Sequence, residues 1–136
     1  MSVDQFAGTW VQSSQEKFEE YMKEAGVGLI TRKAAANLKV TCKITVEGNT
    51  VHWRQESSLK NYELTFTVGE DMEEETADGR HFKTNFHWVG DKLVQEQTPI
   101  KDGDKPSTIS RWVQGNELHI EMVCGSVTAK RVYTKQ

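Results

Sequence analysis

From residue 39 to the C-terminus, apolar and polar residues alternate in short runs, and most runs are followed by a turn signal. Successive side chains of a strand point to opposite faces, so each run predicts a strand with one face turned inward. Many short strands at regular spacing are typical of a β-barrel or a β-sandwich. The turns that separate them are Gly48-Asn49, Asp78-Gly79, Gly90-Asp91, Gly115-Asn116 and Gly125-Ser126. The chain is therefore predicted to be all-β.

A helical segment interrupts this pattern after a first strand, which is expected over residues 6–12. Ser13 and Glu16 have the spacing of a capping box, which marks the start of a helix. An apolar stripe at helical spacing follows, made of Phe18, Tyr21, Met22 and Ala25. Gly26 and Gly28 are expected to end this helix, and a second short helix is expected after them. Such an insertion would close one end of a barrel.

The length of 136 residues predicts a single domain over residues 1–136. Only 36% of the residues are hydrophobic and 27% are charged, so a β domain of this composition has a small core or a partly polar interior. The net charge of −3 gives no reason to expect nucleic acid, which favours strongly basic surfaces. No stretch is long enough to cross a membrane and no signal peptide is recognised, so we expect a cytoplasmic protein.

Neither the cysteines nor the histidines form a pattern that indicates catalysis or metal binding. Cys42 and Cys124 lack metal-ligand spacing and fall on inward faces, which predicts small buried thiols. The histidines are expected on outward faces, and they are His52, His81, His87 and His119. No serine elbow and no cysteine–histidine pattern is present. We therefore expect no enzymatic activity, no metal and no cofactor.

Two arginines fall on the inward faces of the last strands. Arg111 shares a face with Ile109, and Arg131 shares one with Tyr133. If the turns that join the last three strands are two-residue turns, both arginines lie opposite Ile120, about 10 Å apart at the backbone. An arginine cannot lose its proton inside a protein, and burial of its charge without a partner is costly. The pair therefore predicts a site for an anion.

Other side chains that are predicted to face inward have two interpretations. Gln97, together with Gln95 and Thr84, either anchors water in a cavity or is an ordinary polar group of a barrel. Phe18 and Tyr21 either line a cavity for an apolar ligand or belong to the core, because the side chains inside a barrel fill or enclose its space. The acidic run at 70–75 lacks the calcium-loop pattern and is predicted to be a solvated strand edge.

The order and spacing of several motifs strongly resemble those of the intracellular lipid-binding proteins, which include the fatty acid-binding and cellular retinoid-binding proteins. The likeness extends over essentially the whole chain. The motifs are Phe6-Ala7-Gly8-Thr9-Trp10, Phe18-Glu19-Glu20-Tyr21-Met22-Lys23, Gly26-Val27-Gly28, Thr31-Arg32-Lys33, Ser58-Leu59-Lys60-Asn61, Thr76-Ala77-Asp78-Gly79-Arg80 and Arg131-Val132-Tyr133.

The resemblance implies a ten-stranded antiparallel flattened barrel, with a helix-turn-helix cap after the first strand, around a cavity that contains water. In the acid-binding members, an arginine and an Arg-x-Tyr motif near the C-terminus hold the ligand carboxylate. These roles fall on Arg111, Arg131 and Tyr133 of this chain. Retinol-binding members carry glutamine at the arginine positions, so this chain resembles the acid binders.

The resemblance also implies where the ligand enters. Leu59 occupies the portal position, which is often phenylalanine in the family, and Asp78 and Arg80 flank a hairpin tip near the portal. An ordinary pair of turn residues, with no role at the portal, is an equally good interpretation of Asp78 and Arg80. The basic residues around the helices predict either transient contact with an anionic membrane or a solvated helix face. These residues are Lys23, Arg32, Lys33 and Lys39.

The function implied by the resemblance is that of a non-catalytic intracellular carrier for a hydrophobic monocarboxylate, with a long-chain fatty acid preferred. Retinoic acid is the alternative ligand, since residues 112–122 resemble the retinoid branch. An internal salt bridge, an enzyme that uses the same cavity and an interaction module with a collapsed interior are less favoured interpretations. We expect a monomer.

Overall fold

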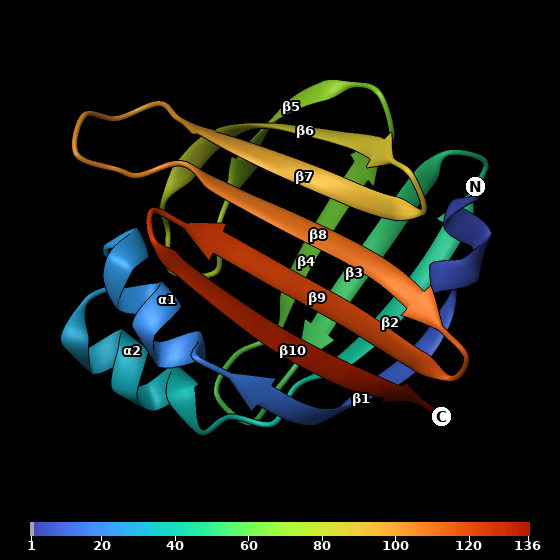
Figure 1. Cartoon of the computed structure of the whole chain (residues 1–136), viewed down its shortest axis with the longest axis horizontal. Helices are drawn as coiled ribbons and strands as arrows, with labels where there is room; N and C mark the ends of the chain where they lie inside the picture. The colour runs from blue at the N-terminus through green and yellow to red at the C-terminus, as the bar shows by residue number, and fades with distance from the viewer. Residues whose placement is uncertain (1) are drawn as a thin grey trace.

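Ten antiparallel strands form one continuous sheet that curls into a nearly closed barrel (Figure 1). The computed structural model describes residues 2–136. The strand order is β4-β3-β2-β1-β10-β9-β8-β7-β6-β5, so β1 and β10 are neighbours, and β4 and β5 are the edges. The strands are β1 (Gly8–Glu16), β2 (Thr41–Glu47), β3 (Thr50–Glu56), β4 (Tyr62–Thr67), β5 (Asp71–Glu75), β6 (His81–Val89), β7 (Lys92–Pro99), β8 (Ser107–Gln114), β9 (Glu117–Cys124) and β10 (Val127–Lys135). The expected ten-stranded antiparallel barrel is confirmed.

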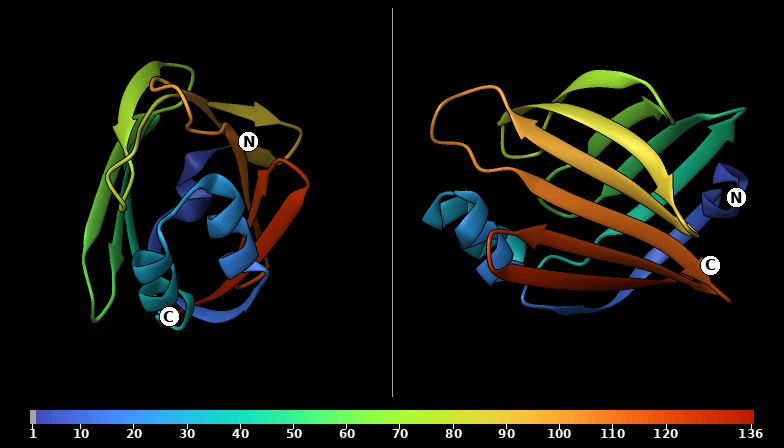
Figure 2. Two further views of the ribbon diagram at one scale, coloured as in Figure 1. Left: turned by 90° about the vertical axis from the view of Figure 1, so that its left-hand side faces the viewer. Right: turned by 45° about the horizontal axis from the view of Figure 1, so that its top comes forward.

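Two helices between β1 and β2 cover one end of the barrel, as expected (Figures 1 and 2). They are α1 (Phe18–Ala25) and α2 (Leu29–Ala36), and a short 3-10 helix, η1 (Val3–Phe6), lies at the opposite end. The apolar stripe of α1 is buried at Tyr21, Met22 and Ala25, and the helix ends at Gly26, whose φ of 96° is left-handed. Within the described part of the chain, no helix is long and apolar enough to cross a membrane.

The first strand is longer than the sequence predicts, and the capping-box prediction is wrong. β1 pairs with β10 as far as Glu16, with a β-bulge at Ser13 where the register shifts between Gln12 and Ser14. The Ser13 hydroxyl donates to the backbone carbonyl of Val132 at 3.0 Å rather than capping a helix. Pairing with a strand that is distant in sequence therefore overrides the local helix signal.

The predicted register of the last three strands is confirmed. Arg111 of β8 and Arg131 of β10 both lie opposite Ile120 of β9, one on each side. Gly115 and Gly125 have φ angles of 61° and 56°, the left-handed backbone that tight hairpin turns require. The turns thus bring both arginines onto the inner face of the barrel.

The end of the barrel around η1 is filled by aromatic side chains. Trp10 is 0% exposed, and its indole N–H donates to the backbone carbonyl of Phe6 at 2.9 Å. The Phe6 ring packs against Trp53 and Trp88, with ring centroids 6.2 and 6.3 Å apart. The core therefore closes this end, and a cavity lies at the helix-covered end.

Candidate functional site

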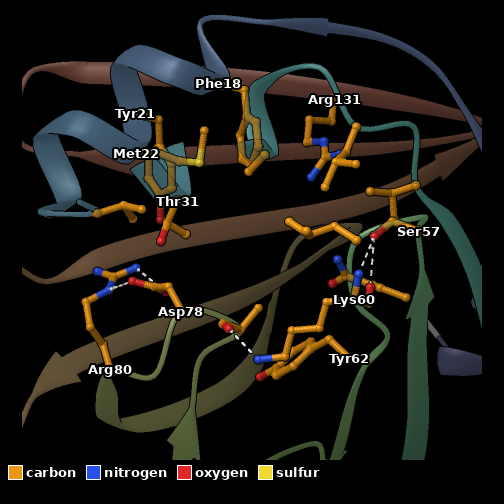
Figure 3. A pocket seen from close by; sticks show the side chains of 17 residues that line it. Phe18, Tyr21, Met22, Thr31, Ser57, Lys60, Tyr62, Asp78, Arg80 and Arg131 are labelled. Carbon is orange, nitrogen blue, oxygen red and sulfur yellow. Dashed lines mark hydrogen bonds and ion pairs between the residues drawn. The ribbon is translucent and has the colours of Figure 1, made fainter. Parts of the chain in front are cut away.

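A cavity of about 250 Å³ lies between the two helices and the barrel wall (Figure 3). Much of its lining is apolar and includes Met22, Val27, Ala35, Leu38 and Val40. Arg131 lies beside Phe18 at one side of the cavity, whereas Asp78 and Arg80 lie together at the other side (Figure 3). An elongated apolar molecule can therefore meet a positive charge at one end of this space.

Arg131 lines the cavity, although only 7% of its surface is exposed to solvent. Its Nη2 donates to Oε1 of Gln12 at 2.8 Å, and its Nε is buried with no hydrogen-bond partner in the described chain. The guanidinium carbon stands 4.3 Å from the centre of the Phe18 ring, which is a cation–π contact. The side chain is thus held by neutral groups, and part of its donor capacity is unused.

Arg111 is 9% exposed and lies outside the cavity lining. Its guanidinium stands 5.0 Å from the centre of the Trp53 ring and 5.5 Å from that of Phe86. Neither Nε nor Nη1 has a hydrogen-bond partner among residues 2–136. Burial lowers the pKa of Arg111, and the charge of Glu74 opposes this effect. A second permanent cation is therefore buried next to the site.

Glu74 corrects the interpretation of the acidic run as a solvated strand edge. This residue of β5 is 5% exposed, and Oε1 accepts hydrogen bonds from Gln95 at 2.8 Å and from Gln97 at 3.1 Å. Within residues 2–136 it forms no ion pair with Arg111 or Arg131 within 4.0 Å. Alternation could have placed Glu74 on the face of Met72, but the acidity of the whole run concealed that signal.

Tyr133 and Cys42 lie close to the arginines and remain protonated. Burial raises the pKa of Tyr133 far above its usual range, against the opposing charge of Arg131. Burial also raises the pKa of the Cys42 thiol to about 11, although Arg131 and Arg111 both act to lower it. Tyr133 is therefore a hydroxyl donor, and Cys42 is not a thiolate nucleophile at neutral pH.

The structure brings Arg131 and five other predicted site residues to the cavity, whereas Arg111, Tyr133 and Gln97 lie outside its lining. The cavity lining contains Phe18, Tyr21, Leu59, Asp78 and Arg80. Gln97 lies elsewhere, where its amide donates to Glu74. The lining also contains polar residues that the sequence analysis did not assign to the site, namely Thr31, Gln55, Ser57, Lys60 and Tyr62.

Asp78 and Arg80 join the β5–β6 hairpin to helix α1. Arg80 donates from Nε to Asp78 at 2.7 Å and from Nη1 to the backbone carbonyl of Ala25 at 3.0 Å. Burial alone would raise the pKa of Asp78, but hydrogen bonds from Arg80 and Thr76 hold it below its ordinary value. The two residues are therefore more than a plain turn pair, because they hold a helix end at the rim of the cavity.

The basic residues of the helices are partly neutralised within the molecule. Arg32 and Lys33 of α2 both form ion pairs with Glu19 of α1. Arg32 also donates to the backbone carbonyl of Val27 at 2.9 Å. Contact between these residues and an anionic membrane stays a prediction.

Comparison with known proteins agrees with this architecture. The model of the lipocalin / cytosolic fatty-acid binding protein family matches residues 7–136. Fatty acid-binding protein homolog 6 of Caenorhabditis elegans is 46% identical over 132 residues, which cover 97% of this chain and 98% of that protein.

Two solved structures share the fold over nearly their whole length. Apo lipid binding protein 8 of Caenorhabditis elegans has a TM-score of 0.95 and 34% identity, with 100% of this chain and 99% of that chain covered. The Schistosoma mansoni fatty acid binding protein in complex with arachidonic acid has a TM-score of 0.90 and 31% identity, with the same coverage. Because the family model and these likenesses extend over the barrel and its helices alike, this chain belongs to the lipocalin / cytosolic fatty-acid binding protein family.

Proposed function

We propose that this protein is a non-catalytic cytoplasmic carrier of long-chain fatty acids, and that Arg111, Arg131 and Tyr133 hold the ligand carboxylate. The observation that carries the proposal is a pair of buried guanidinium groups in which Nε and Nη1 of Arg111 and Nε of Arg131 have no hydrogen-bond partner in the described chain. A buried cation without an anion is costly, and neither arginine can lose its proton. A carboxylate offers both the negative charge and the acceptor oxygens that these groups lack.

The three residues have different parts in the proposed site. Arg131 makes the direct contact with the carboxylate, because it lines the cavity. Tyr133 lies two residues further along the same strand face and contributes a hydroxyl donor. Arg111 lies across Ile120 from Arg131 and contributes mainly through its charge. A single head group thus satisfies two cations that form no ion pair with a carboxylate among residues 2–136.

The apolar wall of the cavity suits a hydrocarbon tail. Side chains from both helices face the barrel there, among them Phe18, Met22 and Ala35. Each buried methylene contributes about 0.8 kcal/mol, so a long chain supplies much of the affinity. The arginines then orient the molecule with its head group inward.

The names of two relatives support a fatty acid among the hydrophobic monocarboxylates. One relative is a fatty acid-binding protein homolog, and another was solved in complex with arachidonic acid, a long-chain carboxylic acid. Retinoic acid has the same head-group chemistry and is therefore the competing ligand in the test.

Oleate is expected to bind at least tenfold more tightly than oleyl alcohol, a difference of about 1.4 kcal/mol or more, since only oleate carries a charge for the arginines. Calorimetric titration of the delipidated protein with oleate, oleyl alcohol, retinoic acid and retinol measures this difference. Equal affinities for oleate and oleyl alcohol would contradict the proposed site. Tighter binding of retinoic acid than of oleate would indicate a retinoid carrier, and chemical change of the recovered oleate would indicate an enzyme.

A further inference from the structure

Two neighbouring strands inside the barrel carry hydrogen-bonding groups of opposite kind that the protein does not use. Gln95 of β7 is 1% exposed, and its Oε1 is buried without a hydrogen-bond partner among residues 2–136. Arg111 of β8 is also buried, and its Nε and Nη1 have no partner in the same part of the chain. The oxygen of Gln95 can only accept a hydrogen bond, whereas the two nitrogens of Arg111 can only donate. The two residues therefore offer complementary bonding capacity.

The strand register places these two side chains close together. Gln95 lies opposite Ile109, and Arg111 is two residues further along β8 on the same inner face. Diagonal neighbours of this kind are within reach of each other when the side chains are long. The guanidinium of Arg111 lies 5.5 Å from the centre of the Phe86 ring, and Phe86 is the partner of Gln95 on β6. The arginine therefore leans across β7 at the level of Gln95.

The Gln95 amide is held in one orientation by its nitrogen. Nε2 donates to Oε1 of Glu74 at 2.8 Å and to the hydroxyl of Thr84 at 3.2 Å, which uses both of its N–H groups. Turning the amide over would point its oxygen at the Glu74 carboxylate, so Oε1 remains a free acceptor. Burial lowers the pKa of Arg111 and the charge of Glu74 opposes this effect, which indicates that a negative charge already lies near the guanidinium.

A hydroxyl group suits Gln95 and Arg111 better than a second carboxylate does. Its oxygen can accept from Arg111 while its proton is donated to Gln95. A carboxylate has no proton to donate, so it would leave Oε1 of Gln95 unsatisfied and would be repelled by Glu74. The cavity lining contains Arg131 but neither Arg111 nor Gln95, so the two residues lie beside the head group rather than along the tail.

We propose that Gln95 and Arg111 bind a hydroxyl group on the carbon next to the ligand carboxylate, so that 2-hydroxy fatty acids are a preferred class of ligand. The inference rests on the proposed function, because a carboxylate at Arg131 positions the hydroxyl. Arg131 and Arg111 flank Ile120, one on each side, which brings both parts of such a head group within reach. Carbon 2 of the ligand is a stereocentre, so only one enantiomer directs its hydroxyl to Gln95 and Arg111 while its tail stays in the cavity.

The two enantiomers of 2-hydroxypalmitate test this site in the wild-type protein. Mirror-image molecules cost the same to remove from water, so a difference in affinity arises from contacts with the protein. Calorimetric titration of the delipidated protein is expected to show at least a tenfold preference for one enantiomer, roughly the effect of one hydrogen bond to a charged group. The preferred enantiomer is expected to bind at least as tightly as palmitate, since a buried hydroxyl without partners would weaken binding.

Gln95→Met removes the acceptor with little change in side-chain length. We expect the preference to fall to about threefold or less, which is the effect of losing one hydrogen bond, with the affinity for palmitate within about twofold of wild type. Gln97→Met is the matched control, because Gln97 donates to the same Glu74 oxygen at 3.1 Å but has no buried atom without a partner in the described chain. This variant is expected to keep the full preference.

Side-chain amide NMR of the wild-type protein follows the same site without a substitution. The Nε2 signal of Gln95 is expected to differ between the complexes with the two enantiomers, and that of Gln97 to differ less. Equal affinities of the enantiomers, weaker binding of both than of palmitate, an undiminished preference in Gln95→Met or an unchanged Gln95 signal would overturn the hydroxyl site, while the oleate titration still supports the carrier. If oleate and oleyl alcohol bind equally well, the carboxylate site and the hydroxyl site fail together.

Discussion

Replacing Arg131 by glutamine is expected to lower the affinity for oleate by roughly 30- to 900-fold, which corresponds to about 2–4 kcal/mol of binding free energy. The glutamine removes the charge and the guanidinium donors that line the cavity. The free energy of unfolding is expected to change by less than about 1 kcal/mol, because the buried charge is itself costly in the folded protein. Calorimetric titration and urea denaturation of the same variant measure the two quantities.

Arg54→Gln is the matched control for this variant. Arg54 lies on β3, where it pairs with Glu56 and Glu63 and is partly exposed. The same substitution there is expected to leave the oleate affinity unchanged, since the side chain does not line the cavity. If Arg131→Gln lowered stability and affinity by equal free energies, Arg131 would be a structural residue rather than a ligand-binding one.

Trp10→Ala is expected to lower stability rather than ligand affinity. The free energy of unfolding is expected to fall by about 3–5 kcal/mol. Trp10 is 0% exposed, and its indole N–H donates to Phe6 at the closed end of the barrel. The substitution leaves a large cavity and an unpaired carbonyl there. Trp10 does not line the ligand cavity, so the oleate affinity of the folded variant is expected to stay within about twofold of wild type. Urea denaturation and titration below the unfolding transition provide both values.

Trp112→Ala is the control for the loss of an indole. Trp112 stacks on His119 with ring centroids 5.3 Å apart and is only partly buried. We expect the free energy of unfolding of this variant to fall by about 1 kcal/mol or less. A loss of affinity in Trp10→Ala that matched its loss of stability would show that the closed end and the ligand site do not act independently.

Much of the inner surface of the barrel could be predicted from the sequence, because alternation and turn chemistry are local signals. Gly115 and Gly125 set two tight turns, and these turns placed Arg111 and Arg131 on either side of Ile120. The number of strands and the closure of the barrel were not accessible in this way. Pairing of β1 with β10 joins the two ends of the chain, and only the family resemblance indicated it.

The sequence predictions that were wrong failed because they depend on partners that are distant in the sequence. The helix signal at Ser13 failed because β10 pairs with β1 through a bulge, which no local pattern reveals. The contact between Gln12 and Arg131 joins β1 to β10, at opposite ends of the chain, and was missed because no local pattern reveals that pairing. Glu74 was assigned to solvent because a carboxylate inside a barrel needs donors from other strands, here Gln95 and Gln97 of β7. Long-range partners therefore decide which polar residues can be buried.

The central claim is that buried, positively charged side chains receive the carboxylate of the ligand. It is tested most directly by carbon-13 NMR of oleate labelled at its carboxyl carbon, bound to the protein and followed as the pH is lowered. Guanidinium groups close to a carboxyl group lower its pKa by roughly 1–3 units. The carboxyl signal is therefore expected to remain that of an ionised group well below the ordinary carboxyl pKa of about 4. Titration of the bound carboxyl group at its ordinary value, as for a head group in water, would contradict the account.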